Sequence, residues 1–166
     1  TQYLGGAVGA MGPRAPEGPD DSSRVVAMGQ ALGKLILAND DQLEFRDSLD
    51  IATAGLPVGM PPFQLRPMEN NVDWRISPVI TRMLGLRREG WIHGVLVGDL
   101  FFIGMPFDFC GETSVVWKKW AEGEGLDLWT LSFCSTYCGY FSPDKYYLDT
   151  PLNYETGFMS WFGPNV

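Results

Sequence analysis

The clearest pattern of apolar positions lies between residues 90 and 103, where two apolar runs flank the dipeptide Gly98-Asp99. Two strand-forming runs separated by a two-residue turn that contains glycine are typical of a β-hairpin. Residues 126–133 form a further apolar run with the character of a buried strand. The sequence therefore predicts a hairpin and, after a helical segment, a buried strand.

Apolar residues recur at helical spacing in three segments, residues 21–38, 74–84 and 113–121. Side chains three or four positions apart share one face of a helix. Asp20 or Asp21 can cap the first helix, and the G-E-G run at 123–125 ends the third. The predicted apolar faces consist of Val25, Met28, Leu32 and Leu35 in the first helix, Ile76, Val79, Ile80 and Met83 in the second, and Val116, Trp117 and Trp120 in the third.

The other segments carry weaker signals. Residues 1–8 and 63–68 are predicted as short strands, residues 43–54 are rich in strand formers, and residues 55–62 are predicted as a loop. The aromatic, Pro- and Gly-rich residues 135–166 are predicted as an ordered loop packed on the domain. Together these segments predict a mixed α/β fold: a mostly mixed β-sheet flanked by helices, with a long ordered C-terminal loop region.

Composition narrows the classes of function. The chain has 166 residues, 45% of them hydrophobic and 19% charged, which is enough for one domain with a core. Its net charge of -8 argues against a nucleic-acid partner, because binding to phosphates rests on basic patches. The most apolar stretch, residues 95–109, is interrupted by Asp99 and Pro106 and is too short to span a bilayer. We therefore expect neither a nucleic-acid partner nor a transmembrane segment.

Two further motifs are ambiguous. Cys110, Cys134 and Cys138 lack the C-x-x-C spacing of a zinc finger, so we expect mostly buried small apolar residues. The glycine-rich residues 5–14 lack the Gly-Lys-Ser/Thr ending of a phosphate loop. This segment is either a tight loop beneath another segment or a loop that lines a site.

The strongest candidate for chemistry follows the second strand of the hairpin. Gly104 and Pro106 break that strand, and Asp108 comes next, just before a predicted helix. A second polar cluster, residues 135–140, follows the next strand. Loops just beyond strand ends are frequent places for functional side chains. Asp108 could instead cap the helix, with Glu112 in its first turn.

The order of these motifs resembles the catalytic domain of the neutral/alkaline (non-lysosomal) ceramidases. The resemblance lies in G-D-L-F-F-I-G-M-P-F-D-F at 98–109, T-Y-C-G-Y at 136–140, Y-E-T-G at 154–157 and F-G-P at 162–164. More weakly, G-A-V-G-A-M-G-P-R at 6–14 resembles the nucleophile loop of that family. The alternative interpretation of the tyrosines is that they are packed aromatic residues with satisfied hydroxyls.

The resemblance implies a zinc-dependent amidohydrolase that cleaves the amide of an N-acyl sphingoid lipid. It implies that Asp108 and Tyr140 are metal ligands and that Tyr154 stabilises the oxyanion. Gly12 stands at the serine position of the nucleophile loop, and Asp108 stands where the family has Glu. The two histidine ligands lie upstream in the family, and His93, the single histidine, matches neither and is interpreted as a structural strand residue.

These departures predict either the C-terminal half of a ceramidase-like catalytic domain or a single domain that has lost its metal site. The first hypothesis is a lipid amide hydrolase, altered or inactive because of Gly12, with zinc bound only if a longer parent chain supplies histidines. The alternative is a non-catalytic lipid- or ligand-binding domain on the same scaffold. The expected partner is a lipid or small amide, with membrane-surface contact through aromatic residues as a further option, and the resemblance is compatible with a secreted or periplasmic location.

Three geometric expectations follow. Asp108, Tyr140 and Tyr154 should converge around one cleft, because loops after neighbouring strands meet in space. Gly12 should lie beside that cleft. The chain alone should not hold zinc tightly, because Asp108 and Tyr140 are fewer than the three protein ligands of a catalytic zinc site.

Overall fold

The computed structural model describes residues 4–9, 11–12, 14, 16–64, 66, 74–86, 88–148 and 155–164. The chain divides into two compact units. One comprises Gly12–Leu49, and the other comprises Thr1–Met11 together with Asp50–Val166. The larger unit contains the predicted sheet and most of the candidate chemistry.

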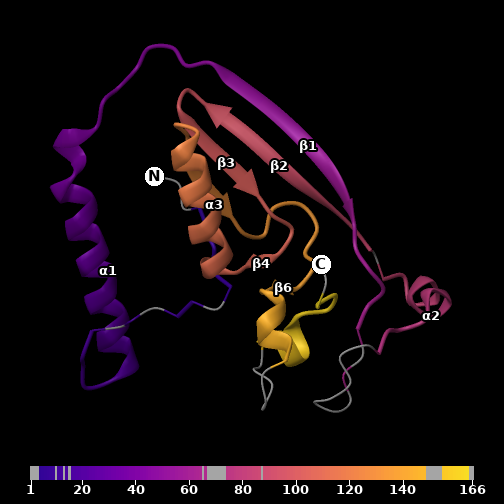
Figure 1. The fold of residues 1–166 in the computed structure, drawn as a ribbon. Coiled ribbons are helices and arrows are strands. Elements are labelled where there is room, and N and C mark those ends of the chain that lie inside the picture. The colour runs from indigo at the N-terminus through magenta and orange to yellow at the C-terminus, as the bar shows by residue number, and fades with distance from the viewer. Residues whose placement is uncertain are drawn as a thin grey trace. The chain divides into compact units, whose positions relative to one another are not determined.

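A four-stranded mixed sheet forms the framework of the larger unit (Figure 1). The hairpin is confirmed, since Val97 pairs with Leu100 across the turn and Gly98 has the left-handed φ of 60° that such a turn requires. The sheet order is β1-β2-β3-β5, antiparallel except between β3 and β5, with bounds β1 Ile51–Gly59, β2 Glu89–Val97, β3 Leu100–Gly104 and β5 Asp127–Leu131. The predicted mixed α/β fold is confirmed.

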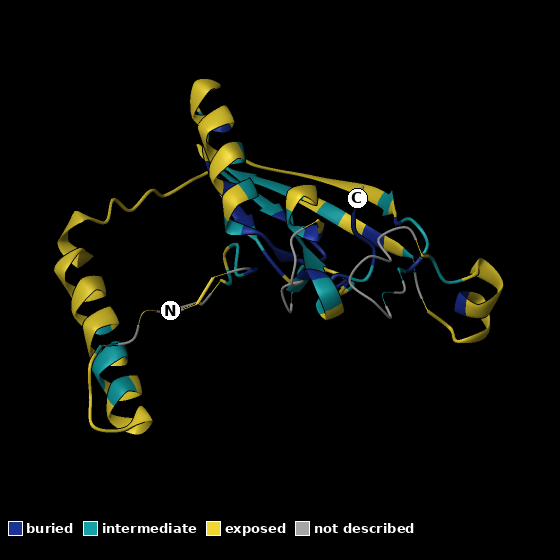
Figure 2. Cartoon of the chain, turned by 60° about the horizontal axis from the view of Figure 1, so that its bottom comes forward, coloured by how far each residue is buried: buried dark blue, intermediate teal, exposed yellow. Residues whose placement is uncertain are grey.

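Helix α3, Gly111–Gly123, makes the crossover between the parallel strands β3 and β5. It packs on β5 through Ala121 and through a buried 2.6 Å hydrogen bond between the hydroxyls of Ser114 and Thr130. Two of its predicted inward residues point to solvent, since Val116 is 60% and Trp120 61% exposed. Figure 2 shows that exposed residues alternate with intermediate or buried ones along the longer helices of the chain. The third predicted residue, Trp117, does pack against the core, on Phe109. The buried side chains of α3 are the small ones of Ser114 and Ala121.

Strand β1 corrects the predicted loop at residues 55–62. Residues 55–59 belong to this strand and pair with β2 from His93 back to Glu89. Pro57 is compatible with a strand here because β1 is the edge of the sheet, where a missing N–H need not break a ladder. Proline therefore indicated a loop where the chain has an edge strand.

The predicted helix at 74–84 is shorter, and its apolar face is not buried. Helix α2 spans Pro78–Met83 and is capped by Ser77, and Thr81 is its buried residue. Its apolar side chains are exposed (Val79, Ile80 and Met83), and Ile76 reaches the core from before the helix. Of the strand predicted at 63–68, the described residues show one bridge, Gln64 with Arg75.

The core lies where the C-terminal region meets the loops after the strands. A short parallel pair joins β4, Asp108–Phe109, to β6, Tyr140–Phe141. The buried cluster around it consists of Met60, Phe63, Met105, Phe107, Phe109, Cys138 and Phe162. Two short helices, η2 at Asp144–Tyr147 and η3 at Glu155–Met159, complete the predicted C-terminal loop region.

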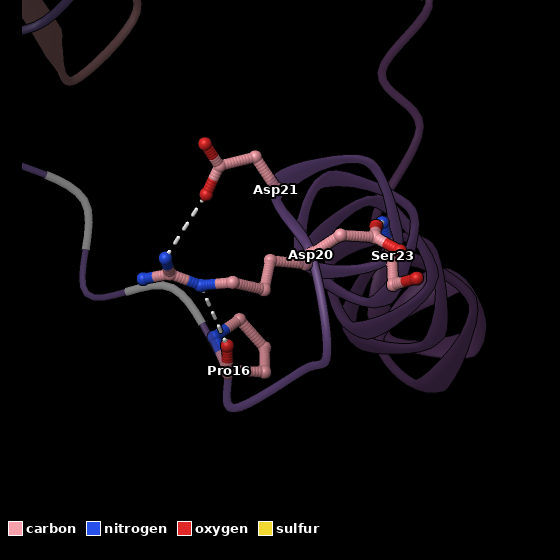
Figure 3. Close-up of polar contacts among 5 residues, drawn as sticks. Pro16, Asp20, Asp21 and Ser23 are labelled. Carbon is pink, nitrogen blue, oxygen red and sulfur yellow. Dashed lines mark hydrogen bonds and ion pairs between the residues drawn. The ribbon is translucent and has the colours of Figure 1, made fainter.

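The smaller unit is built on helix α1, Asp21–Ala38, with the bounds that the sequence predicts, followed by the short helix η1, Asp40–Gln42. The carboxylate of Asp20 accepts from the Ser23 N–H at 2.7 Å and so caps the helix, while Arg24 bonds to Asp21 and to the Pro16 carbonyl (Figure 3). None of its predicted apolar face is buried. No helix of the described residues has the length and apolar character needed to cross a membrane.

Candidate functional site

Asp108 and Tyr140 are direct register partners in the short β4–β6 ladder. Paired residues of a ladder project from the same face of the sheet. Asp108 is 6% exposed, and its N–H donates to the Gly139 carbonyl at 3.0 Å. The structure therefore brings together the two residues that the resemblance implies as metal ligands.

Tyr137 holds the Asp108 carboxylate. Its hydroxyl donates to Oδ2 of Asp108 at 2.6 Å, the length of a charge-assisted bond. The Tyr137 ring packs edge-on against Trp161 at 5.3 Å and tilted against Phe133 at 5.9 Å. Sequence reasoning missed this partner. The Y-C-G-Y spacing could have suggested it, because Gly139 has φ of 80° and turns the chain between the two tyrosines.

The alternative role of Asp108 as a helix cap is wrong. Cys110 occupies the N-cap position of α3, and no side chain caps the helix. Glu112 does lie in the first turn, where its two carboxylate oxygens accept from Lys145 and Tyr146, each at 2.6 Å. Hydrogen bonds from Lys145 and then Tyr146 lower the pKa of Glu112. Asp108 therefore does not cap the helix, and its carboxylate accepts a hydrogen bond from the phenol of Tyr137 instead.

The loop after β5 carries unusual backbone geometry. Phe133 and Ser135 have φ of 61° and 70°, a region that side-chain-bearing residues rarely adopt. Main-chain bonds fix the loop, with the Cys134 N–H donating to the Met105 carbonyl at 2.8 Å. A Cβ at Gly104 would lie 2.8 Å from the Cys134 side chain, so glycine is needed there. Such conformations are frequent near functional sites, and this loop leads directly to Tyr137.

The glycine-rich segment contacts the site through Gly9. The Gly9 N–H donates to the Phe109 carbonyl at 2.9 Å, and its carbonyl accepts from the Gly111 N–H at 3.2 Å. A Cβ on Gly9 would lie 2.5 Å from the Asp108 carbonyl oxygen. The segment is a tight loop against β4, and residues 4–8, predicted within a strand, are not one. Gly12 belongs to the other unit, so its predicted place beside the site stays a prediction.

The remaining candidates add no ligands in the described part of the chain. Tyr154 lies outside the described residues. His93 is exposed on β2, where its ring stacks on Trp91 at 6.2 Å. Cys110 and Cys138 are buried as predicted, and Cys134 is half-buried. Among the residues that the structure describes, no three His, Cys, Asp or Glu side chains cluster closely enough to hold a metal ion.

A pocket of about 510 Å³ opens beside the site. Tyr137 lines it and links it to Asp108 through the 2.6 Å hydrogen bond. Most of the wall is apolar or aromatic, and this volume is in the range of small-molecule sites. The arrangement can hold an apolar ligand next to a buried carboxylate.

Two solved structures are similar in fold. One is a neutral ceramidase from Pseudomonas aeruginosa, with a TM-score of 0.53 and 16% identity over 92% of this chain and 32% of that chain. Another is a ceramidase complexed with C2, with a TM-score of 0.51 and 15% identity over 88% of this chain and 32% of that chain. The chain thus has a ceramidase-like fold and spans about a third of the length of these structures. No protein-family model and no curated protein matches it.

Gly139 is expected to be essential for the geometry of the site. A Cβ there would lie 2.5 Å from the Met159 carbonyl oxygen, and its φ of 80° disfavours any other residue. We expect Gly139→Ala to lower the free energy of unfolding by about 3 kcal/mol. Gly125→Ala is the matched control, because φ is 74° there and nothing lies within 4 Å; it should cost about 1 kcal/mol. Equal losses by urea denaturation would contradict the steric argument.

Proposed function

We propose that this chain is part of a hydrolase that cleaves the amide of a long-chain N-acyl lipid. The observation that carries the proposal is the register pairing of the buried Asp108 with Tyr140 in a ceramidase-like fold. The adjoining pocket supports it, because its apolar wall suits an acyl chain. By the resemblance, N-acyl sphingoid lipids are the substrate class.

Zinc does not fit the described residues by themselves. Asp108 and Tyr140 would supply two oxygen ligands, whereas catalytic zinc is held by three protein ligands, usually with nitrogen or sulfur among them. Among the residues that the structure describes, no three His, Cys, Asp or Glu side chains lie close enough together to complete a metal site. Further ligands, such as histidines of a longer parent chain, are required before zinc can act here.

Within the proposed site, each of the chain's own groups has a distinct task. Tyr137 orients the Asp108 carboxylate by its 2.6 Å hydrogen bond. Tyr140 adds a phenol on the same face, and Gly9 supports β4 by the hydrogen bond from its N–H to the Phe109 carbonyl. Tyr154 is proposed as the phenol that donates to the developing oxyanion, an interaction that stabilises the transition state.

A non-catalytic lipid-binding role is the second candidate. It is favoured by Gly12, which has no side chain to act at the serine position of the nucleophile loop. The two roles differ in one measurable respect. A hydrolase releases a free fatty acid from a bound N-acyl lipid, whereas a binding domain returns the lipid intact. Mass spectrometry of N-dodecanoylsphingosine incubated with the protein that contains this chain separates them, and lipid bound but never cleaved by that protein would overturn the hydrolase proposal.

The metal content of the isolated chain gives a further test. We expect the purified 166-residue chain to retain less than about 0.1 zinc per molecule after dialysis, because two oxygen ligands bind zinc weakly. Plasma emission spectrometry measures the ratio. One zinc per chain, lost in Asp108→Ala but kept in Asp99→Ala, would show that this chain completes the site without a longer parent.

A further inference from the structure

The pocket beside Asp108 has a polar end with unpaired groups. Gln64 and Arg66 both line it. Three of their side-chain atoms are buried without a hydrogen-bond partner: Nε2 and Oε1 of Gln64 and Nε of Arg66. Buried polar atoms are nearly always paired, and each one left unpaired is costly. These two donor groups and one acceptor therefore indicate a ligand that supplies the missing partners.

The charge at this end is positive. Arg66 is the only charged residue among the described residues of the pocket lining. Its other nitrogens donate to the carbonyls of Tyr147 and Thr156, and no carboxylate of the described residues forms an ion pair with it. Burial lowers the pKa of Arg66, and so does Arg75, which lies across the bridge from Gln64. A chain with a net charge of -8 thus has a local cationic site, and an anionic group suits it.

The rest of the wall suits an alkyl chain. Phe63, Ile76, Leu86, Phe158 and Trp161 line the pocket, which has a volume of about 510 Å³. Apolar walls with a few convergent polar groups are typical of sites that orient an amphiphilic ligand. The ligand therefore combines an apolar chain with an anionic, hydrogen-bonding head.

We propose that this pocket binds a long-chain N-acyl amino acid. Its carboxylate accepts from Nε of Arg66 and Nε2 of Gln64, its amide N–H, two bonds from the carboxylate carbon, donates to Oε1 of Gln64, and its acyl chain lies along the apolar wall. A fatty carboxylate alone leaves Oε1 unpaired, and a neutral acyl amide leaves Arg66 without an anion. Only the cleavage of the bound amide rests on the proposed hydrolase function; the binding does not.

Isothermal titration calorimetry with N-dodecanoylglycine tests the inference, using N-dodecanoylethanolamine and dodecanoate as comparison ligands below their micelle concentrations. We expect one saturable site for N-dodecanoylglycine and at least about tenfold weaker binding of both comparison ligands. The ethanolamide lacks the carboxylate and so loses a charge-assisted hydrogen bond, and dodecanoate lacks the amide N–H that donates to Gln64. Comparable affinity for the ethanolamide or for dodecanoate would overturn the assignment of the head group.

Gln64→Glu is the decisive variant. It keeps the side-chain shape and adds a carboxylate to the pocket that Arg66 also lines, so it should raise the melting temperature and weaken the binding of N-dodecanoylglycine more than tenfold. Arg82→Met, on the exposed surface of α2, is the control, because it makes the net charge more negative by the same amount. It should change neither the melting temperature nor the binding of N-dodecanoylglycine. Unchanged binding by Gln64→Glu would place the ligand elsewhere. Because binding is the readout, this result is independent of whether the protein cleaves any amide.

Discussion

Replacing Asp108 by alanine is expected to lower the rate of lipid amide hydrolysis by at least about 100-fold. Asp108 is 6% exposed, its carboxylate accepts a hydrogen bond from Tyr137, and it pairs with Tyr140, so the substitution removes the acidic group of the proposed reaction centre. The measurement is the rate of dodecanoate release by the protein that contains this chain. The loss should appear mainly in kcat, because the apolar pocket that we propose for the acyl chain is unchanged.

Two further variants are the controls for the Asp108→Ala measurement. Asp99→Ala removes a carboxylate from the exposed hairpin turn and should leave the rate unchanged. Asp108→Glu keeps the carboxylate and should retain more activity than Asp108→Ala, since the resembled family has Glu at this position. If Asp108→Ala is as active as Asp99→Ala, Asp108 takes no part in the reaction.

Phe109→Ala is expected to lower the free energy of unfolding by about 4 kcal/mol. Phe109 is fully buried and packs against Trp117 and Phe141, with ring centroids 4.9 and 5.5 Å apart. Removing the ring leaves a cavity where α3, β4 and β6 meet, and the surrounding elements can close it only partly. Urea denaturation followed by tryptophan fluorescence measures the change.

The control for this prediction is Phe158→Ala in the same unit. Phe158 is 79% exposed, so its removal should change the free energy of unfolding by no more than about 0.5 kcal/mol. The slope of free energy against urea should stay constant for both variants, as expected for a change in stability alone. Similar losses for the two phenylalanines would mean that the β4–β6 ladder is not the centre of the core.

The elements that the sequence predicts well are those with local signals. The hairpin is specified by Gly98-Asp99 between two apolar runs, and α1 by the Asp20 cap and helical spacing. The end of α3 is likewise specified by Gly125, which has φ of 74°. Each of these signals acts within a few residues, so the fold around it does not change its meaning.

Burial and long-range pairing could not be predicted in the same way. Helical spacing grouped Val116 and Trp120 into an apolar face, but the face that meets β5 is chosen by close packing of Ser114 and Ala121. The spacing of apolar residues cannot indicate whether another element covers them. Strand β1 was missed because the effect of Pro57 depends on whether its strand is at an edge.

The candidate site shows the same division. Motif order led to Asp108 and Tyr140, and the structure pairs them in register. Tyr137 was missed because its hydroxyl reaches Asp108 across 29 residues of sequence, through a ladder only two residues long. Gln64 and Arg66 carry no motif at all, and their unpaired atoms become visible only when the pocket around them is formed.

The most direct test of the central claim is the release of dodecanoate from N-dodecanoylsphingosine and N-dodecanoylglycine, measured by mass spectrometry with the wild-type and Tyr140→Phe forms of the protein that contains this chain. The variant keeps the ring and removes the hydroxyl of the residue that pairs with Asp108 in the β4–β6 ladder. We predict release from at least one substrate by the wild-type protein and at least about a 100-fold loss in the variant. Equal release by both proteins, or none by the wild type from either lipid, would contradict a reaction centre built on Asp108 and Tyr140.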